Sequence, residues 1–120
     1  MRVALHRGDI RLVRFLVDDL TGISTEIDFS EIYFTVKKTA RDRAFLFQKR
    51  LSTGGILKLG LGDYQVKIEP GDTDNLSYGN YLFDIQLVWN DEQGDQQLKE
   101  TFVGDFVVEE EITFRNNEEV

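Results

Sequence analysis

The chain lacks cysteine entirely, and proline, tryptophan and histidine each occur only once. Without cysteine there is no disulfide, no thiolate zinc site and no thiol nucleophile. The single histidine, His6, has no second imidazole with which to share a metal ion, and no Ser-His-acid pattern surrounds it. We therefore expect a protein that is not an enzyme.

Long hydrophobic runs are missing as well. No window approaches the roughly 20 apolar residues that a membrane-spanning helix requires. Residues 1–10, MRVALHRGDI, contain no apolar run of the length found in signal peptides. The sequence therefore indicates neither a membrane segment nor an export signal.

Positive charge is scarce, because 14 lysines and arginines stand against 22 acidic residues, which gives a net charge of −8. Such a chain is repelled by the phosphates of nucleic acids and by anionic lipids, so we expect neither as a partner. The most basic segment, residues 37–50, is interrupted by Asp42 and by the apolar run 44–47. We interpret this segment as a solvated hairpin. No glycine-rich phosphate loop is present.

Clustered carboxylates are the remaining candidates for a metal site, in residues 18–28 and at Asp72 and Asp74. Calcium takes about six to eight oxygen ligands, often from loops. Neither cluster has the spacing of an EF-hand loop, and aspartates in such places are typical of turns and helix caps. We therefore predict no metal and no cofactor.

Alternation of apolar and polar residues is the dominant signal, and it predicts β-strands. It is clearest in residues 78–94, YGNYLFDIQLVWNDEQG, where every second residue from Tyr81 to Trp89 is aromatic or aliphatic. The other predicted strands are 3–5, 13–17, 32–36, 56–59, 64–68, 95–103 and 105–114. Gly94 closes a hairpin loop, and Asp72 is expected to cap one helical turn.

About seven to eight short strands predict an all-β fold, an antiparallel two-sheet β-sandwich of the immunoglobulin-like type. The 120 residues fit a single domain, 1–120, that ends in a polar acidic tail, 115–120. In a sandwich one face of each strand is buried. The row from Tyr81 to Trp89 is therefore interpreted as core, and the alternative is an exposed platform for a ligand. Trp89 is the one candidate contact residue, because its indole N–H lies at a strand end.

A family resemblance rests on several ordered segments. Residues 79–87, GNYLFDIQL, resemble the G-x-Y-x-Y-D-I-Q-L signature of small Ig-like sandwich domains in tailed-phage virion proteins, such as the N-terminal domain of phage baseplate upper proteins. Residues 28–38 resemble the family's D-L-T/S…F-x-V-K segment, and residues 64–73 resemble its Y-x-V-x-I-x-P-x-D-T strand and turn. Residues 101–113 resemble its closing T-x-x-G-x-F-x-V…V/I-T pattern.

The resemblance runs from about residue 8 to residue 113, with departures. The family's Tyr-Asp pair is Phe83-Asp84 here, and the loop 18–30 and the hairpin 44–51 follow no family pattern. These motifs carry no catalytic or receptor-binding residue that could be transferred.

The resemblance implies a non-enzymatic structural or attachment component of a phage or prophage particle, in the baseplate, the tail or the head. The implied partners are other phage structural proteins, in a homo-oligomer or hetero-oligomer on the particle. The implied location is the virion, or the host cytoplasm before assembly. Stoichiometry and position in the particle are not specified by these motifs.

Two further functions fit the residues. A ligand-binding β-sandwich, such as a carbohydrate-binding module, would expose at least two coplanar aromatic rings from the set Tyr33, Tyr78, Tyr81 and Trp89. A bacterial Ig-like adhesion module is disfavoured, because the sequence shows neither a signal peptide nor tandem copies.

Overall fold

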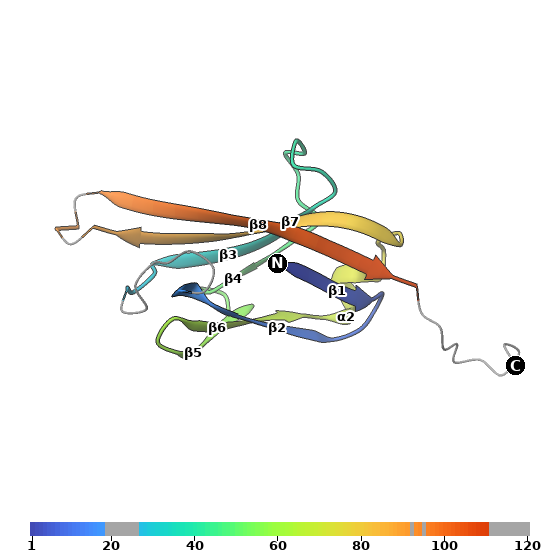
Figure 1. Cartoon of the computed structure of the whole chain (residues 1–120), viewed down its shortest axis with the longest axis horizontal. Coiled ribbons are helices and arrows are strands. Elements are labelled where there is room, and N and C mark those ends of the chain that lie inside the picture. Colours follow the sequence, from blue (N-terminus) through green and yellow to red (C-terminus); the bar gives the residue numbers. More distant parts are fainter. Residues whose placement is uncertain (19–26, 92, 95, 111–120) are drawn as a thin grey trace, which may run out of the picture.

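The computed structural model describes residues 1–18, 27–91, 93–94 and 96–110. Within them, eight strands form two sheets that lie one above the other (Figure 1). The predicted all-β fold of two sheets is thereby confirmed. Among the helical segments of this part of the chain, none is long and apolar enough to cross a membrane.

The larger sheet has five strands in the order β1-β8-β7-β3-β4. Their bounds are Arg2–His6 for β1, Gln97–Glu109 for β8, Gly79–Asn90 for β7, Glu31–Lys37 for β3 and Phe47–Arg50 for β4. Strand β1 runs parallel to the end of β8, with Arg2 paired to Asp105, and the other pairs are antiparallel. The sheet is therefore mixed, which corrects the prediction of a purely antiparallel sandwich. Parallel pairing is open to β1 because nearly the whole chain separates it from β8, whereas a short hairpin would impose the antiparallel direction.

The smaller sheet has three antiparallel strands in the order β2-β6-β5. Strand β2 spans Arg11–Leu16, β6 spans Asp63–Ile68 and β5 spans Ile56–Gly60. These strands coincide closely with the predicted ones. Apolar residues on alternate positions bury one face of β2 and of β6, whereas Ile56 is the one buried residue of β5.

Residues 97–109 form one continuous strand, where two strands, 95–103 and 105–114, were predicted. Gly104 lies within this strand opposite Phe83, and a Cβ at this position would approach Phe83 Cζ and the Met1 carbonyl oxygen to 2.5 Å. The glycine thus leaves room for a ring rather than ending the strand. Ile112 and Phe114, part of the second predicted strand, lie outside the described residues.

The helical turn after β6 is α2, Pro70–Thr73, and its N-cap is Glu69 rather than Asp72. Pro70 sets the start because its fixed φ suits the first helical position. Asp72 then becomes the third helical residue, and its carboxylate accepts a hydrogen bond of 2.7 Å from the Glu69 backbone N–H. The two residues form a reciprocal capping box.

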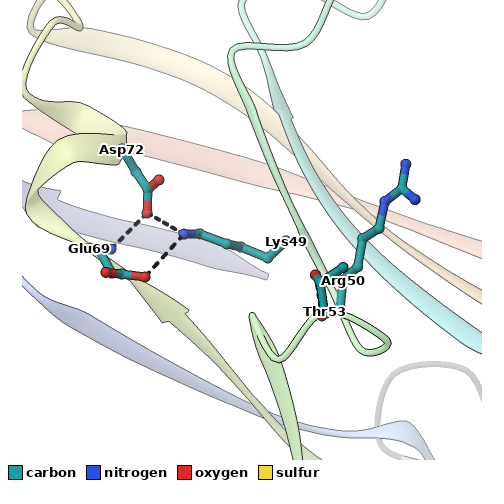
Figure 2. A network of polar contacts seen from close by, with 5 residues as sticks. All are labelled: Lys49, Arg50, Thr53, Glu69 and Asp72. Atoms are coloured by element: carbon teal, nitrogen blue, oxygen red, sulfur yellow. Dashed lines mark hydrogen bonds and ion pairs between the residues drawn. The ribbon is translucent and has the colours of Figure 1, made fainter.

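A charged contact joins the two sheets through this turn (Figure 2). Lys49 on β4 extends towards α2, and its Nζ lies 2.7 Å from Asp72 Oδ2 and 3.7 Å from Glu69 Oε1. Its neighbour Arg50 points to the opposite side of the strand (Figure 2). Since the Lys49 side chain is only 13% exposed, this ion pair is shielded from solvent more than most surface pairs.

The core fills the space between the sheets, and the row of residues on β7 belongs to it. Tyr81, Phe83, Ile85 and Leu87 are all buried, which confirms their interpretation as core. Phe83 stacks on Phe34 of β3, with ring centroids 5.1 Å apart. The sandwich is therefore held mainly by apolar burial.

We predict that Gly104→Ala destabilises the fold by about 1–3 kcal/mol, because a methyl group would overpack the space that the Phe83 ring fills. Gly71→Ala is the matched control, since a Cβ added at Gly71 would have no other atom within 4 Å and the backbone there is not left-handed. Urea denaturation followed by tryptophan fluorescence measures both. Equal stability of the two variants would contradict this role of Gly104.

Candidate functional site

The connection between β3 and β4 rises from the outer face of the five-stranded sheet, away from the smaller sheet (Figure 1). Its residues Arg43 and Phe45 help to enclose a hollow of about 250 Å³ on that face. We call this the polar hollow. It is lined by Tyr33, Thr35, Lys37, Arg43, Phe45, Gln48, Asp84 and Gln86.

Strand register brings these residues together from distant parts of the chain. Thr35 on the central strand β3 pairs with Gln48 of β4 on one side and with Asp84 of β7 on the other. Two residues earlier on β3, Tyr33 pairs with Arg50 and with Gln86 of β7. Because side chains alternate across a strand, these cross-strand rows share the outer face.

Hydrogen bonds fix the wall of the hollow beside β4. Gln48 Nε2 donates to Thr35 Oγ1 at 3.0 Å, and Arg50 Nε donates to Gln48 Oε1 at 3.0 Å. The Arg50 guanidinium also lies over the Tyr33 ring, 5.1 Å from its centroid. Arg50 therefore covers one face of that ring and holds the neighbouring amide in a single orientation.

Asp84 is the unusual member of the polar hollow. Burial raises the pKa of its carboxyl, and the nearby Lys37 ammonium opposes that shift without cancelling it. No other described residue forms a hydrogen bond with its carboxylate. A carboxyl group whose pKa is raised by partial burial in a surface hollow is a candidate member of a binding site.

Sequence reasoning did not single out Asp84 or the polar hollow. Asp84 occupies a polar position in an alternating strand, which is also the pattern of an ordinary solvated residue. Asp84 differs from an ordinary solvated residue because it lies beside Thr35 and Lys37, and this proximity depends on β3 and β7 being adjacent. Alternation within one strand does not contain that information.

A second hollow, of about 220 Å³, adjoins the first. Thr35, Lys37 and Asp84 line both, and Ala40 and Val103 help to line the second. The shared residues lie at the junction, so one elongated ligand could contact both hollows.

The polar hollow is lined by several kinds of hydrogen-bonding group. They include carboxylate, ammonium, guanidinium, amide and hydroxyl groups. In the described part of the chain, no group of three or more His, Cys, Asp or Glu residues could hold a metal ion. Asp72 of one predicted carboxylate cluster contacts Lys49 instead, and residues 19–26 of the other lie outside the described residues.

The predicted contact residue Trp89 lies elsewhere, at the far end of β7. It is partly buried against the core, with its ring edge-on to Phe29 at 5.7 Å. It lines a separate hollow of about 520 Å³ together with Ile27 and Leu98.

The four aromatic residues predicted for a ligand platform do not share one surface. Tyr33 lies on the outer face of the larger sheet, whereas Tyr81 is buried beneath that sheet. Tyr78 precedes β7, at the end of the strand opposite Trp89, and contacts Arg7. Among the described residues, no two of these four rings are therefore exposed side by side on one face, as the predicted platform would require.

A contrasting surface lies on the smaller sheet. Leu12 and Leu16 of β2 and Leu57 of β5 point outward, opposite in direction to the buried residues of their strands. Three further exposed aliphatic residues lie at the ends of the same sheet. We call the whole set the aliphatic patch: Ile10, Leu12, Leu16, Leu57, Leu59 and Leu61, with exposed fractions from 36% to 69%.

Comparison with known proteins gives no match: no family model, no curated protein and no solved structure matches the chain.

We predict that Asp84→Asn raises the midpoint of thermal unfolding at pH 7. A raised pKa means that the folded state binds the Asp84 proton more tightly than the unfolded state does. Protonation of Asp84 therefore stabilises the fold fully below the ordinary pKa of 3.8, and this stabilisation is lost as pH rises through the raised pKa. Asn cannot ionise, so the variant escapes this loss at pH 7. At a pH of about 3, where the wild-type carboxyl is also protonated, the two proteins should have the same unfolding midpoint.

Scanning calorimetry at both pH values measures this effect. Asp105→Asn is the control, because Asp105 is exposed on β8 and outside the polar hollow. A variant at Asp84 that is less stable than the wild type at pH 7 would show that the carboxylate is well accommodated.

Proposed function

We propose that this chain is a non-enzymatic structural or attachment component of a phage or prophage particle, built as an immunoglobulin-like sandwich. The virion assignment is supported by the ordered motifs between residues 8 and 113. The role in assembly is supported by one structural observation, the aliphatic patch.

The outer face of a sheet at a protein surface is usually polar, because it meets water. Here six aliphatic side chains are exposed on or around a three-stranded sheet. These side chains lie on the two outer strands and at the sheet ends, on either side of the polar central strand β6. Exposed aliphatic side chains gathered on one sheet in this way mark a candidate contact surface between proteins. The patch is therefore suited to packing against another structural protein of the particle.

Charge also favours contact at this face. The chain carries a net charge of −8, which disfavours the approach of other acidic surfaces. Within the patch, however, the Arg14 guanidinium donates two hydrogen bonds to the Asp63 carboxylate, at 2.8 and 2.7 Å. Their charges are balanced locally, and Lys67 on the same face adds a positive charge. An acidic partner therefore meets less repulsion at this face than the net charge of the whole chain would suggest.

A free strand edge offers a further means of attachment. Strand β1 covers β8 only from Asp105 onward, so among the described strands residues 97–104 of β8 have β7 as their sole neighbour. Their outward backbone groups are able to pair with an added strand. On a symmetric particle, several such contacts reinforce each other through avidity.

We predict that the chain sediments with particles released from its source bacterium by prophage induction, and that Leu12→Ser combined with Leu57→Ser lowers its copy number at least about tenfold. A loss of about 1.4 kcal/mol of contact energy is sufficient for a tenfold change. Quantitative mass spectrometry of the particle fraction measures the copy number relative to capsid protein.

Leu46→Ser is the matched control, because Leu46 is a similarly exposed leucine outside the patch. Circular dichroism should show that both variants remain folded, since the replaced side chains are about half exposed. Absence of the wild-type chain from particles would refute the virion assignment, and unchanged incorporation of the double variant would refute the role of the patch.

A further inference from the structure

We propose that the polar hollow is a binding site for a neutral saccharide, with Asp84 and Lys37 contacting its hydroxyl groups and Phe45 packing against the apolar face of a sugar ring. This inference does not depend on the proposed role in a particle.

The polar hollow offers both hydrogen-bond donors and hydrogen-bond acceptors to a ligand. The Asp84 carboxylate offers acceptors, whereas the Lys37 ammonium and the Arg43 guanidinium offer donors. Among the described residues, these three side chains have no hydrogen-bond partner. A sugar hydroxyl both donates and accepts, so adjacent hydroxyls can satisfy a carboxylate and an ammonium together.

The remaining polar groups are already oriented. Gln86 Nε2 donates to Thr101 Oγ1 at 3.4 Å, which leaves Gln86 Oε1 as an acceptor. Thr35 Oγ1 accepts from Gln48, so its own hydroxyl proton is available to a ligand. Fixed orientation lowers the entropic cost of binding, because these side chains do not need to be ordered by the ligand.

The aromatic ring of Phe45 gives the polar hollow an apolar surface for a sugar ring. This side chain is 50% exposed in the 38–46 connection, although it lines a hollow whose other walls are largely polar. An apolar ring beside a group of hydrogen-bonding side chains matches a sugar, which presents C–H groups on one face and hydroxyls at its edges. Tyr33 is less available for stacking, because Arg50 covers its ring.

Charge distinguishes the ligand class. Asp84 lies between Thr35 and Val103 in its cross-strand row, where it would repel a carboxylate or a phosphate that contacted it directly. Lys37 and Arg43 would in turn repel a cation. A neutral ligand with many hydroxyls avoids both repulsions while using all three charged groups.

Size sets the expected strength of binding. The two adjoining hollows measure about 250 and 220 Å³ and are open, so together they reach the lower part of the usual range of roughly 300–1,000 Å³ for small-molecule sites. We therefore expect weak binding by a single copy of the chain, strengthened when several copies are displayed together.

The test begins with the purified full chain on a glycan microarray that carries neutral and acidic bacterial polysaccharides. Binding to neutral glycans is expected. Binding only to acidic glycans, or to no glycan, would overturn the proposal. The array result does not bear on sedimentation with particles, so the two proposals fail independently.

Calorimetric titration with the neutral oligosaccharide that binds best then assigns the site. Asp84→Asn should weaken binding roughly tenfold to a hundredfold, as expected for loss of a hydrogen bond to a charged group. The same variant should retain or increase thermal stability, which separates a binding role from a structural one. Asp105→Asn, on the neighbouring strand, should bind like the wild type.

A second pair of variants tests the 38–46 connection. Arg43→Gln should weaken binding, whereas Arg41→Gln should not, because Arg41 belongs to the same connection but does not line the hollow. Unchanged affinity of both Asp84→Asn and Arg43→Gln would place any saccharide elsewhere and would overturn the assignment.

Discussion

The two sheets differ in size, and this mismatch governs the rest of the structure. Strands β7 and β8 contain 12 and 13 residues, whereas the strands of the smaller sheet contain five or six. Apolar burial stabilises the fold only where the sheets overlap. Beyond the overlap, Trp89 and Phe29 close one end of the core, and the first half of β8 is largely exposed. The larger sheet therefore has a long free edge along β8 and a large outer face, and this face carries the polar hollow.

The two outer faces have opposite chemistry. On the smaller sheet, aliphatic side chains flank a polar central strand, which suits contact with another protein. On the larger sheet, the strand neighbours of β7 place Asp84 in a partly desolvated position, which raises the pKa of its carboxyl. A raised carboxyl pKa in a surface hollow is a common property of functional sites. We therefore propose one surface for assembly and another for a small ligand on the same chain.

Much of the fold could be predicted because burial repeats every second residue along a strand. The row from Tyr81 to Leu87 is core for this reason. The parallel pairing of β1 with β8 could not be predicted, since it depends on which strands become neighbours. The division of 95–114 into two predicted strands was wrong, because Gly104 lies within one continuous strand and leaves room for the Phe83 ring. The polar hollow escaped prediction because Thr35, Gln48 and Asp84 are far apart in the sequence and meet only through strand order.

Hydroxyl-radical footprinting would show whether the two outer faces have separate roles. The reactivity of each side chain would be compared between the free chain and the chain in sedimented particles. We predict that Leu12 and Leu57 become protected in the particle, while Phe45 in the polar hollow stays as reactive as in the free chain. Equal reactivity of Leu12 and Leu57 in both samples would contradict separate roles for the two faces, and so would protection of Phe45 alone.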